Sequence, residues 1–185
     1  MMGGLHIELA ALKTLGDLLE GSGWTGALVT AKVASPGTAD SFLKAAHITR
    51  TRRAHQITAS SLYILLQRAY TEYCREYQGD ELMEMDVWCA DRVAACPHFL
   101  FWYTILHLEL QMLIFIQSIR EANLHLYIQA LTKLVPWFFV LGHTNYARWV
   151  SIHLRDMVAL QGNHPIVYEQ LEISLYRRQP IGFLQ

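Results

Sequence analysis

Histidines, cysteines and carboxylates are the side chains of this sequence that could bind a metal ion or activate water. The chain has nine histidines and three cysteines. Its closest grouping, Cys89, Cys96 and His98, matches none of the usual zinc patterns, in which paired ligands lie about two to five residues apart. We interpret these residues as core thiols beside the start of a helix, and we predict no bound metal and no cofactor.

Three acidic residues occupy places that suggest catalysis, namely Glu8, Glu109 and Asp156, whereas most other acids fall on polar helix faces. His6 and Glu8 are two residues apart and point in different directions on a helix, so they converge only in a loop or at a strand end. The sequence contains no Gly-x-Ser-x-Gly elbow and no phosphate-binding Gly-x-x-x-x-Gly-Lys loop. The catalytic candidates, Glu8, His6 and Asp156, do not form a complete site, which favours a protein that is not an enzyme.

Arginines provide the candidates for phosphate binding. The basic segment from His47 to His55 supplies Arg50, Arg52, Arg53 and His55, and a later aromatic stretch supplies Arg148 and Arg155. Guanidinium groups bind phosphates, so these residues are our candidate nucleic-acid contacts. Two alternatives remain open: a solvated loop between helices, or arginines that pair with carboxylates within the fold.

The composition limits the possible locations and partners. The formal net charge of −1 argues against nucleic-acid binding by bulk charge. Cys74, Cys89 and Cys96 have no disulfide spacing, which is typical of free thiols in a reducing compartment, and the N-terminus has no secretory signal. We expect an intracellular protein of the cytoplasm or nucleus. Its partner is not specified; nucleic acid and the remainder of a parent protein are the two possibilities.

The apolar residues recur every three to four positions along nearly the whole chain, which predicts helices. Long helices are expected over about 5–20, 54–77, 81–95 and 144–160, and Pro136 should kink or split another over 124–141. We find no linker that would divide the sequence. The prediction is an all-α fold, a single irregular bundle of about eight helices over 1–185, without the sheet that a nuclease core needs.

The segment from His98 to Ile119 is apolar and long enough to cross a bilayer. However, Thr104, His107, Gln111 and Ser118 recur at helical spacing on one face, and a charge such as Glu109 is costly at the centre of a membrane. We therefore expect the central helix of a globular core and no membrane partner. A membrane-associated helical protein is the alternative.

Several segments together resemble a large, uncharacterised animal family, known mainly as a domain of unknown function, which multiplies in genomes in the manner of mobile elements. The resemblance rests on Met2-Gly3-Gly4-Leu5-His6-Ile7-Glu8, Ser22-Gly23-Trp24, Gly37 to Leu43, Ala54-His55-Gln56, and His143 to Trp149 with His153 to Met157. It extends to about Tyr168. It implies descent from a transposase or a related nuclease whose longer relatives carry flanking acidic segments that are not present here.

These observations lead to a functional expectation with two alternatives. We expect a non-catalytic helical remnant of a transposon-derived protein, a fragment that acts by binding, with an exposed apolar patch where further segments once packed. The first alternative is a fragment of a nucleic-acid-processing enzyme of the transposase or nuclease type. The second is the membrane-associated protein.

Overall fold

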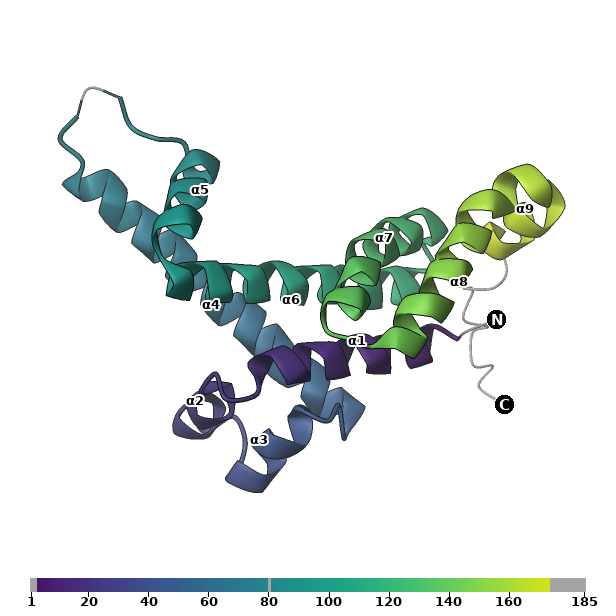
Figure 1. The fold of residues 1–185 in the computed structure, drawn as a ribbon, viewed down its shortest axis with the longest axis horizontal. Helices are drawn as coiled ribbons and strands as arrows, with labels where there is room; N and C mark the ends of the chain where they lie inside the picture. Colours follow the sequence, from purple (N-terminus) through teal and green to yellow (C-terminus); the bar gives the residue numbers. More distant parts are fainter. Residues whose placement is uncertain (1–2, 80, 174–185) are drawn as a thin grey trace, which may run out of the picture.

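The computed structural model describes residues 3–79 and 81–173, and within these ranges every regular element is a helix (Figure 1). The helices are α1 (Gly4–Leu19), α2 (Trp24–Thr30), α3 (Pro36–Phe42), α4 (Ile48–Glu76), α5 (Met85–Ala95), α6 (Pro97–Glu121), α7 (Leu124–Val140), α8 (Thr144–Asn163) and α9 (Pro165–Ile173). The predicted all-α fold is confirmed. The described part of the chain has nine helices where the sequence predicted about eight.

Helix α6 is the element around which the others are arranged. It contacts α1, α4, α5 and α7, while α8 packs on α7 and α9 on α8. Figure 1 shows α4 crossing behind α6, with α5 beside the start of α6 and α7 to α9 grouped at its other end. Since the apolar segment beginning at Pro97 touches four helices, it forms the central helix that the polar stripe predicted.

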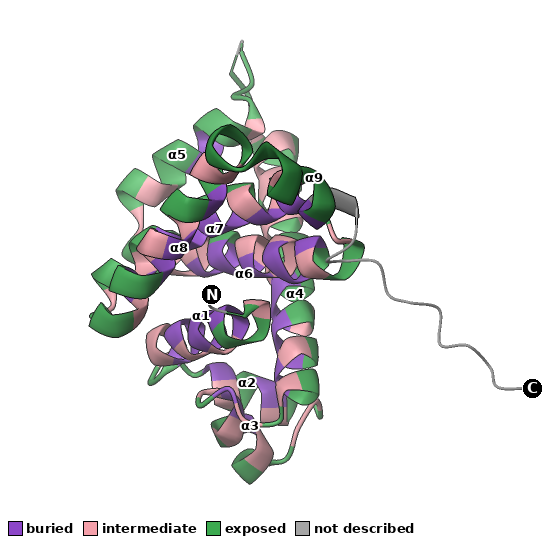
Figure 2. Cartoon of the chain, turned by 90° about the vertical axis from the view of Figure 1, so that its right-hand side faces the viewer, coloured by how far each residue is buried: buried purple, intermediate pink, exposed green. Residues whose placement is uncertain are grey.

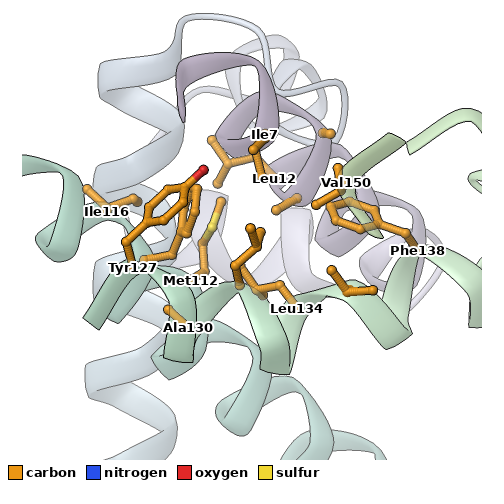
Figure 3. Packing of buried hydrophobic residues seen from close by; sticks show 14 of the residues in the cluster. Ile7, Leu12, Met112, Ile116, Tyr127, Ala130, Leu134, Phe138 and Val150 are labelled. Carbon is orange, nitrogen blue, oxygen red and sulfur yellow. The ribbon is translucent and has the colours of Figure 1, made fainter. Parts of the chain in front are cut away.

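The main hydrophobic core fills the space between α1, α6, α7 and α8. Ile7 and Leu12 of α1 pack with Met112 and Phe115 of α6, and all four side chains are fully buried. Figure 3 shows Leu134, Phe138 and Val150 closing this cluster from α7 and α8. Burying a large aliphatic or aromatic side chain contributes about 1.5–3 kcal/mol, so this cluster supplies much of the stability of the fold.

A smaller core joins the short helices to the crossing of α4 and α6. Leu19, Trp24, Leu28 and Phe42 pack there against Ile105 of α6. In Figure 2 the inward stretches of α1, α4 and α6 are purple, whereas the outer faces of α5 and α9 are mostly green. The short helices α2 and α3 thus form a wall at one end of the α4–α6 crossing.

Two segments differ from the sequence prediction. Helix α4 begins at Ile48, so the basic segment forms its first turns and is not a loop before it. Thr51 is buried there, and its hydroxyl donates to the carbonyl oxygen of Ala46 at 2.5 Å, which fixes this start. Pro136 lies within α7, which continues from Leu124 to Val140 without being split. The predicted split is wrong, since α7 continues for four residues past the proline although Pro136 has no backbone N–H to donate.

Candidate functional site

A large cavity lies between α2, α4 and α6 and has a volume of about 740 Å³. That volume falls within the range of about 300–1,000 Å³ found for small-molecule sites. The lining residues come from all three helices and the turns before α2 and α3: Ser22, Gly23, Trp24, Ala27, Leu28, Ala31, Val33, Ile57, Thr58, Ser61, Leu62, Leu65, Leu66, Ala69, His98, Phe99, Trp102, Tyr103 and Leu106.

The chemistry of this cavity is apolar and uncharged. No carboxylate, ammonium or guanidinium group is among its lining residues, and the polar side chains are those of Ser22, Thr58, Ser61, His98 and Tyr103, with the indole of Trp24. Burial raises the pKa of Tyr103 above its ordinary value, so this phenol stays neutral at physiological pH. The cavity therefore offers a few hydrogen-bonding groups in a predominantly apolar surface.

Trp24 is held in place by a hydrogen bond and a ring contact to α4. Its Nε1 donates a hydrogen bond to Oγ1 of Thr58 at 2.7 Å, and the Thr58 hydroxyl donates to the carbonyl oxygen of Ala54 at 2.9 Å. The indole also stacks on the imidazole of His55, with ring centroids 5.1 Å apart. These contacts bind α2 to α4 and hold one wall of the cavity in place.

Behind Trp24, a buried acid–base pair joins α4 to α6. Nδ1 of His55 lies 2.7 Å from Oε1 of Glu109, and both side chains are almost completely excluded from solvent. Burial raises the pKa of Glu109, and the charge and hydrogen bond of His55 act in the opposite direction. The remaining atoms of the pair, His55 Nε2 and Glu109 Oε2, are buried without a hydrogen-bond partner in the structure.

The structure separates the catalytic candidates. His6 is exposed and Glu8 is buried, so their side chains diverge on α1 as predicted for a helix. Glu8 instead receives hydrogen bonds from Nε and Nη2 of Arg52, the second at 2.5 Å. Asp156 is exposed on α8 and pairs with Arg155 at 2.7 Å. The structure therefore does not bring Glu8, His6 and Asp156 together.

The phosphate-binding candidates are divided between surface and interior. Arg50 and Arg53 are exposed on α4, whereas His55 is buried against Glu109. On α8, the guanidinium of Arg148 lies over the Trp149 ring, 5.7 Å from its centroid. Arg52 therefore pairs with an internal carboxylate, that of Glu8. This pairing is one of the two alternatives given for the basic segment.

His153 of α8 is a buried core histidine with a hydrogen-bond partner. Its Nε2 lies 2.9 Å from the hydroxyl of Tyr127. Burial lowers the pKa of His153, which favours the neutral imidazole in the folded chain.

The cavity itself was missed from the sequence. Leu62, Leu65, Leu66 and Ala69 share one apolar stripe of α4, and Leu65 is 58% exposed where it lines an open cavity. The periodicity identified the face correctly, but it could not show that no other helix of the described chain covers it. Tyr63 and Ile64 beside it are exposed as well, while the expected apolar patch at the site of missing segments stays a prediction.

Metal-binding clusters and membrane-spanning helices are two further features that a functional site could use. Within residues 3–79 and 81–173, no three histidine, cysteine or acidic side chains are grouped so as to hold a metal ion. In the same ranges, α6 has the length and apolar composition of a membrane-spanning helix. The interior of a globular protein can produce such a helix too, and Glu109 of α6 is here buried against α4.

The fold and this site define an all-α protein with an open, uncharged apolar cavity between three helices. The chain belongs to the family described as Domain of unknown function (DUF8702), whose model matches residues 80–177. The match covers α5 to α9 and thus includes one of the three helices that line the cavity. Comparisons with curated proteins and with solved structures find no match to this chain.

Proposed function

We propose that this chain is a non-catalytic binding protein whose ligand is an uncharged, largely apolar small molecule held between α2, α4 and α6. The observation that carries the proposal is the cavity of about 740 Å³ with no carboxylate, ammonium or guanidinium group in its lining. Sites for small molecules are concave and mostly apolar, with a few polar groups that orient the ligand. Burying a charged ligand here would cost several kcal/mol because nothing in the lining would pair with it.

Two polar side chains of the lining, Ser22 and Thr58, already hydrogen-bond within the fold, which favours a largely apolar ligand. Ser22 and Thr58 lie beside Trp24, and Thr58 follows His55 on α4, next to the buried contact with α6. His98 is placed at the beginning of α6. A small molecule can fill the concave space between three helices, whereas a protein helix would bring charged flanks that this lining cannot pair.

The test is binding of Nile red, an uncharged apolar dye, to the whole chain. Ser60 and Ser61 are neighbouring exposed residues of α4, and of the two only Ser61 lines the cavity. We expect Ser61→Phe to weaken dye binding about tenfold, or 1.4 kcal/mol, because the ring occupies cavity space. Ser60→Phe is the matched control and should bind the dye like the parent chain. No dye binding by the parent chain, or equal losses in both variants, would refute the proposal.

We further propose that the domain descends from a mobile element of animal genomes and acts inside the cell. The resemblance of its sequence blocks to that animal family, from Met2-Gly3-Gly4 to His153–Met157, supports the first part. The three free cysteines support the second, because free thiols are typical of reducing compartments. Dispersed genomic copies with flanking acidic segments in frame would strengthen this origin, and a single conserved locus without such segments would count against it.

One contact keeps the nucleic-acid-processing alternative open. Glu8 is a buried acid at the meeting of α1 and α4, and it holds an arginine of the basic segment. If this were part of a nuclease site, DNA nicking would depend on a divalent metal and would be lost in Glu8→Ala. A complete lack of nicking with magnesium, manganese and zinc would remove this alternative.

A further inference from the structure

A second cavity, of about 540 Å³, lies where α1, α4 and α6 meet, away from the apolar cavity. Its lining consists of Glu8 from α1, Arg52 from α4, and Ile116, Ile119 and Arg120 from α6. Two guanidinium groups thus reach one concave site from different helices. Sequence reasoning found Arg52 but missed Arg120, which is distant in the chain and belongs to no basic cluster.

Glu8 acts within this cavity as the residue that positions Arg52. Its carboxylate, 2% exposed, accepts hydrogen bonds from Nε and Nη2 of Arg52. Such a two-pronged contact fixes the plane of the guanidinium and neutralises the charge of Glu8. Nη1 of Arg52 makes no hydrogen bond to the described residues, so one edge of the group remains available for an anion.

Arg120 supplies the charge that is not compensated. Its side chain is exposed, and it forms no hydrogen bond or ion pair with any residue that the structure describes. The adjacent acid, Glu121, accepts a hydrogen bond from Gln117 at 2.7 Å. Because the charges of Glu8 and Arg52 cancel, the lining of the cavity carries a net charge of about +1. The apolar side chains of Ile116 and Ile119 lower the local dielectric constant, which strengthens the attraction between this charge and an anion.

We propose that this cavity binds a phosphate group between Arg120 and the free edge of Arg52. Guanidinium groups match the oxygen geometry of phosphate and remain charged at any physiological pH. Holding Arg52 in place in advance reduces the entropy lost when the ligand binds. The phosphate could belong to a small free anion or to the backbone of a nucleic-acid strand, which offer the same chemistry to the two arginines.

Calorimetric titration of the whole chain with inorganic pyrophosphate tests this site, at an ionic strength kept constant with sodium chloride. Arg120→Gln should weaken binding about ten- to a hundredfold, because it removes charge-assisted hydrogen bonds. Arg53→Gln is the matched control, since Arg53 is an exposed neighbour of Arg52 that does not line the cavity. It removes the same charge and should change the affinity less than about twofold if binding is local.

A second arm replaces pyrophosphate with a short single-stranded DNA. Binding of both probes with the same dependence on Arg120 supports a site for the phosphate group itself, and binding of only one identifies its source. Equal weakening by Arg120→Gln and Arg53→Gln would show diffuse charge attraction and overturn the proposal. Failure of the parent chain to bind either probe would overturn it as well. Neither result bears on the apolar cavity, which Nile red tests separately.

Discussion

Nδ1 of His55 and Oε1 of Glu109 lie 2.7 Å apart in the interior of the contact between α4 and α6. The pair connects the two longest helices and supports Trp24, whose ring stacks on the imidazole. The imidazole of His55 and the carboxyl group of Glu109 are thus buried where α2, α4 and α6 meet, beside the cavity.

Removing one member of this pair should cost more than removing both. Glu109→Leu leaves a buried imidazole without its partner, and we expect unfolding free energy to fall by about 3–5 kcal/mol. The double variant His55→Phe, Glu109→Leu restores an apolar contact and should recover a large part of that loss. Urea unfolding of the two single variants and the double variant measures this. Losses that simply add would show that the two side chains act independently.

His153 should make stability depend on pH below neutrality. Burial lowers the pKa of His153 in the folded chain, whereas the unfolded chain keeps the ordinary value of about 6.5. The contribution is therefore fully present above about pH 6.5 and is lost as the pH falls through the lower folded pKa. His153→Gln should flatten this part of the profile when unfolding free energies are measured from neutral to mildly acidic pH. An unchanged slope would contradict the assignment.

Gly16 allows α1 to approach the backbone at Leu43 closely. A Cβ atom at position 16 would lie 2.7 Å from the carbonyl carbon of Leu43 and 2.9 Å from its Cα. We expect Gly16→Ala to lower stability by about 1–3 kcal/mol through overpacking, which exceeds the gain in helix propensity of about 1 kcal/mol.

Gly26 is the matched control for that substitution. It also lies within a helix, but an added Cβ would meet no atom within 4 Å. Gly26→Ala should therefore stabilise the chain by about 0.5–1 kcal/mol. Thermal unfolding distinguishes the two variants by the sign of the change in Tm. A rise in Tm for both would mean that the backbone at Leu43 moves aside readily.

Local sequence patterns predicted where the helices lie, but they did not predict which helices pack against one another. The periodicity of residues 5–20 predicted α1 to within one residue at each end, because an amphipathic helix is encoded by its own side chains. The start of α4 was placed six residues too late, at 54, since arginines and threonines give no apolar repeat there. These first turns bury Thr51 and pair Arg52 with the distant Glu8, and the local sequence pattern does not show either feature.

The candidate sites depend on pairings between distant parts of the chain. Glu8 and Arg52 are 44 residues apart, and His55 and Glu109 are 54 apart, so no local spacing indicates either contact. Sequence reasoning selected Glu8, Arg52 and Glu109 as unusual residues on chemical grounds, and the structure supplies their partners. The apolar cavity could not be predicted, because it results from the absence of a covering helix over Leu65 in the described fold.

The position of α1 in the main core has a practical consequence for defining the domain. Ile7 and Leu12 occupy the centre of a cluster whose other members lie mainly on α6, α7 and α8. A recombinant protein cut to residues 80–177, the extent of the family match, would leave this interior facing water. Such a truncation is expected to aggregate, so the boundaries of an expressible unit must be drawn to include the N-terminal helix.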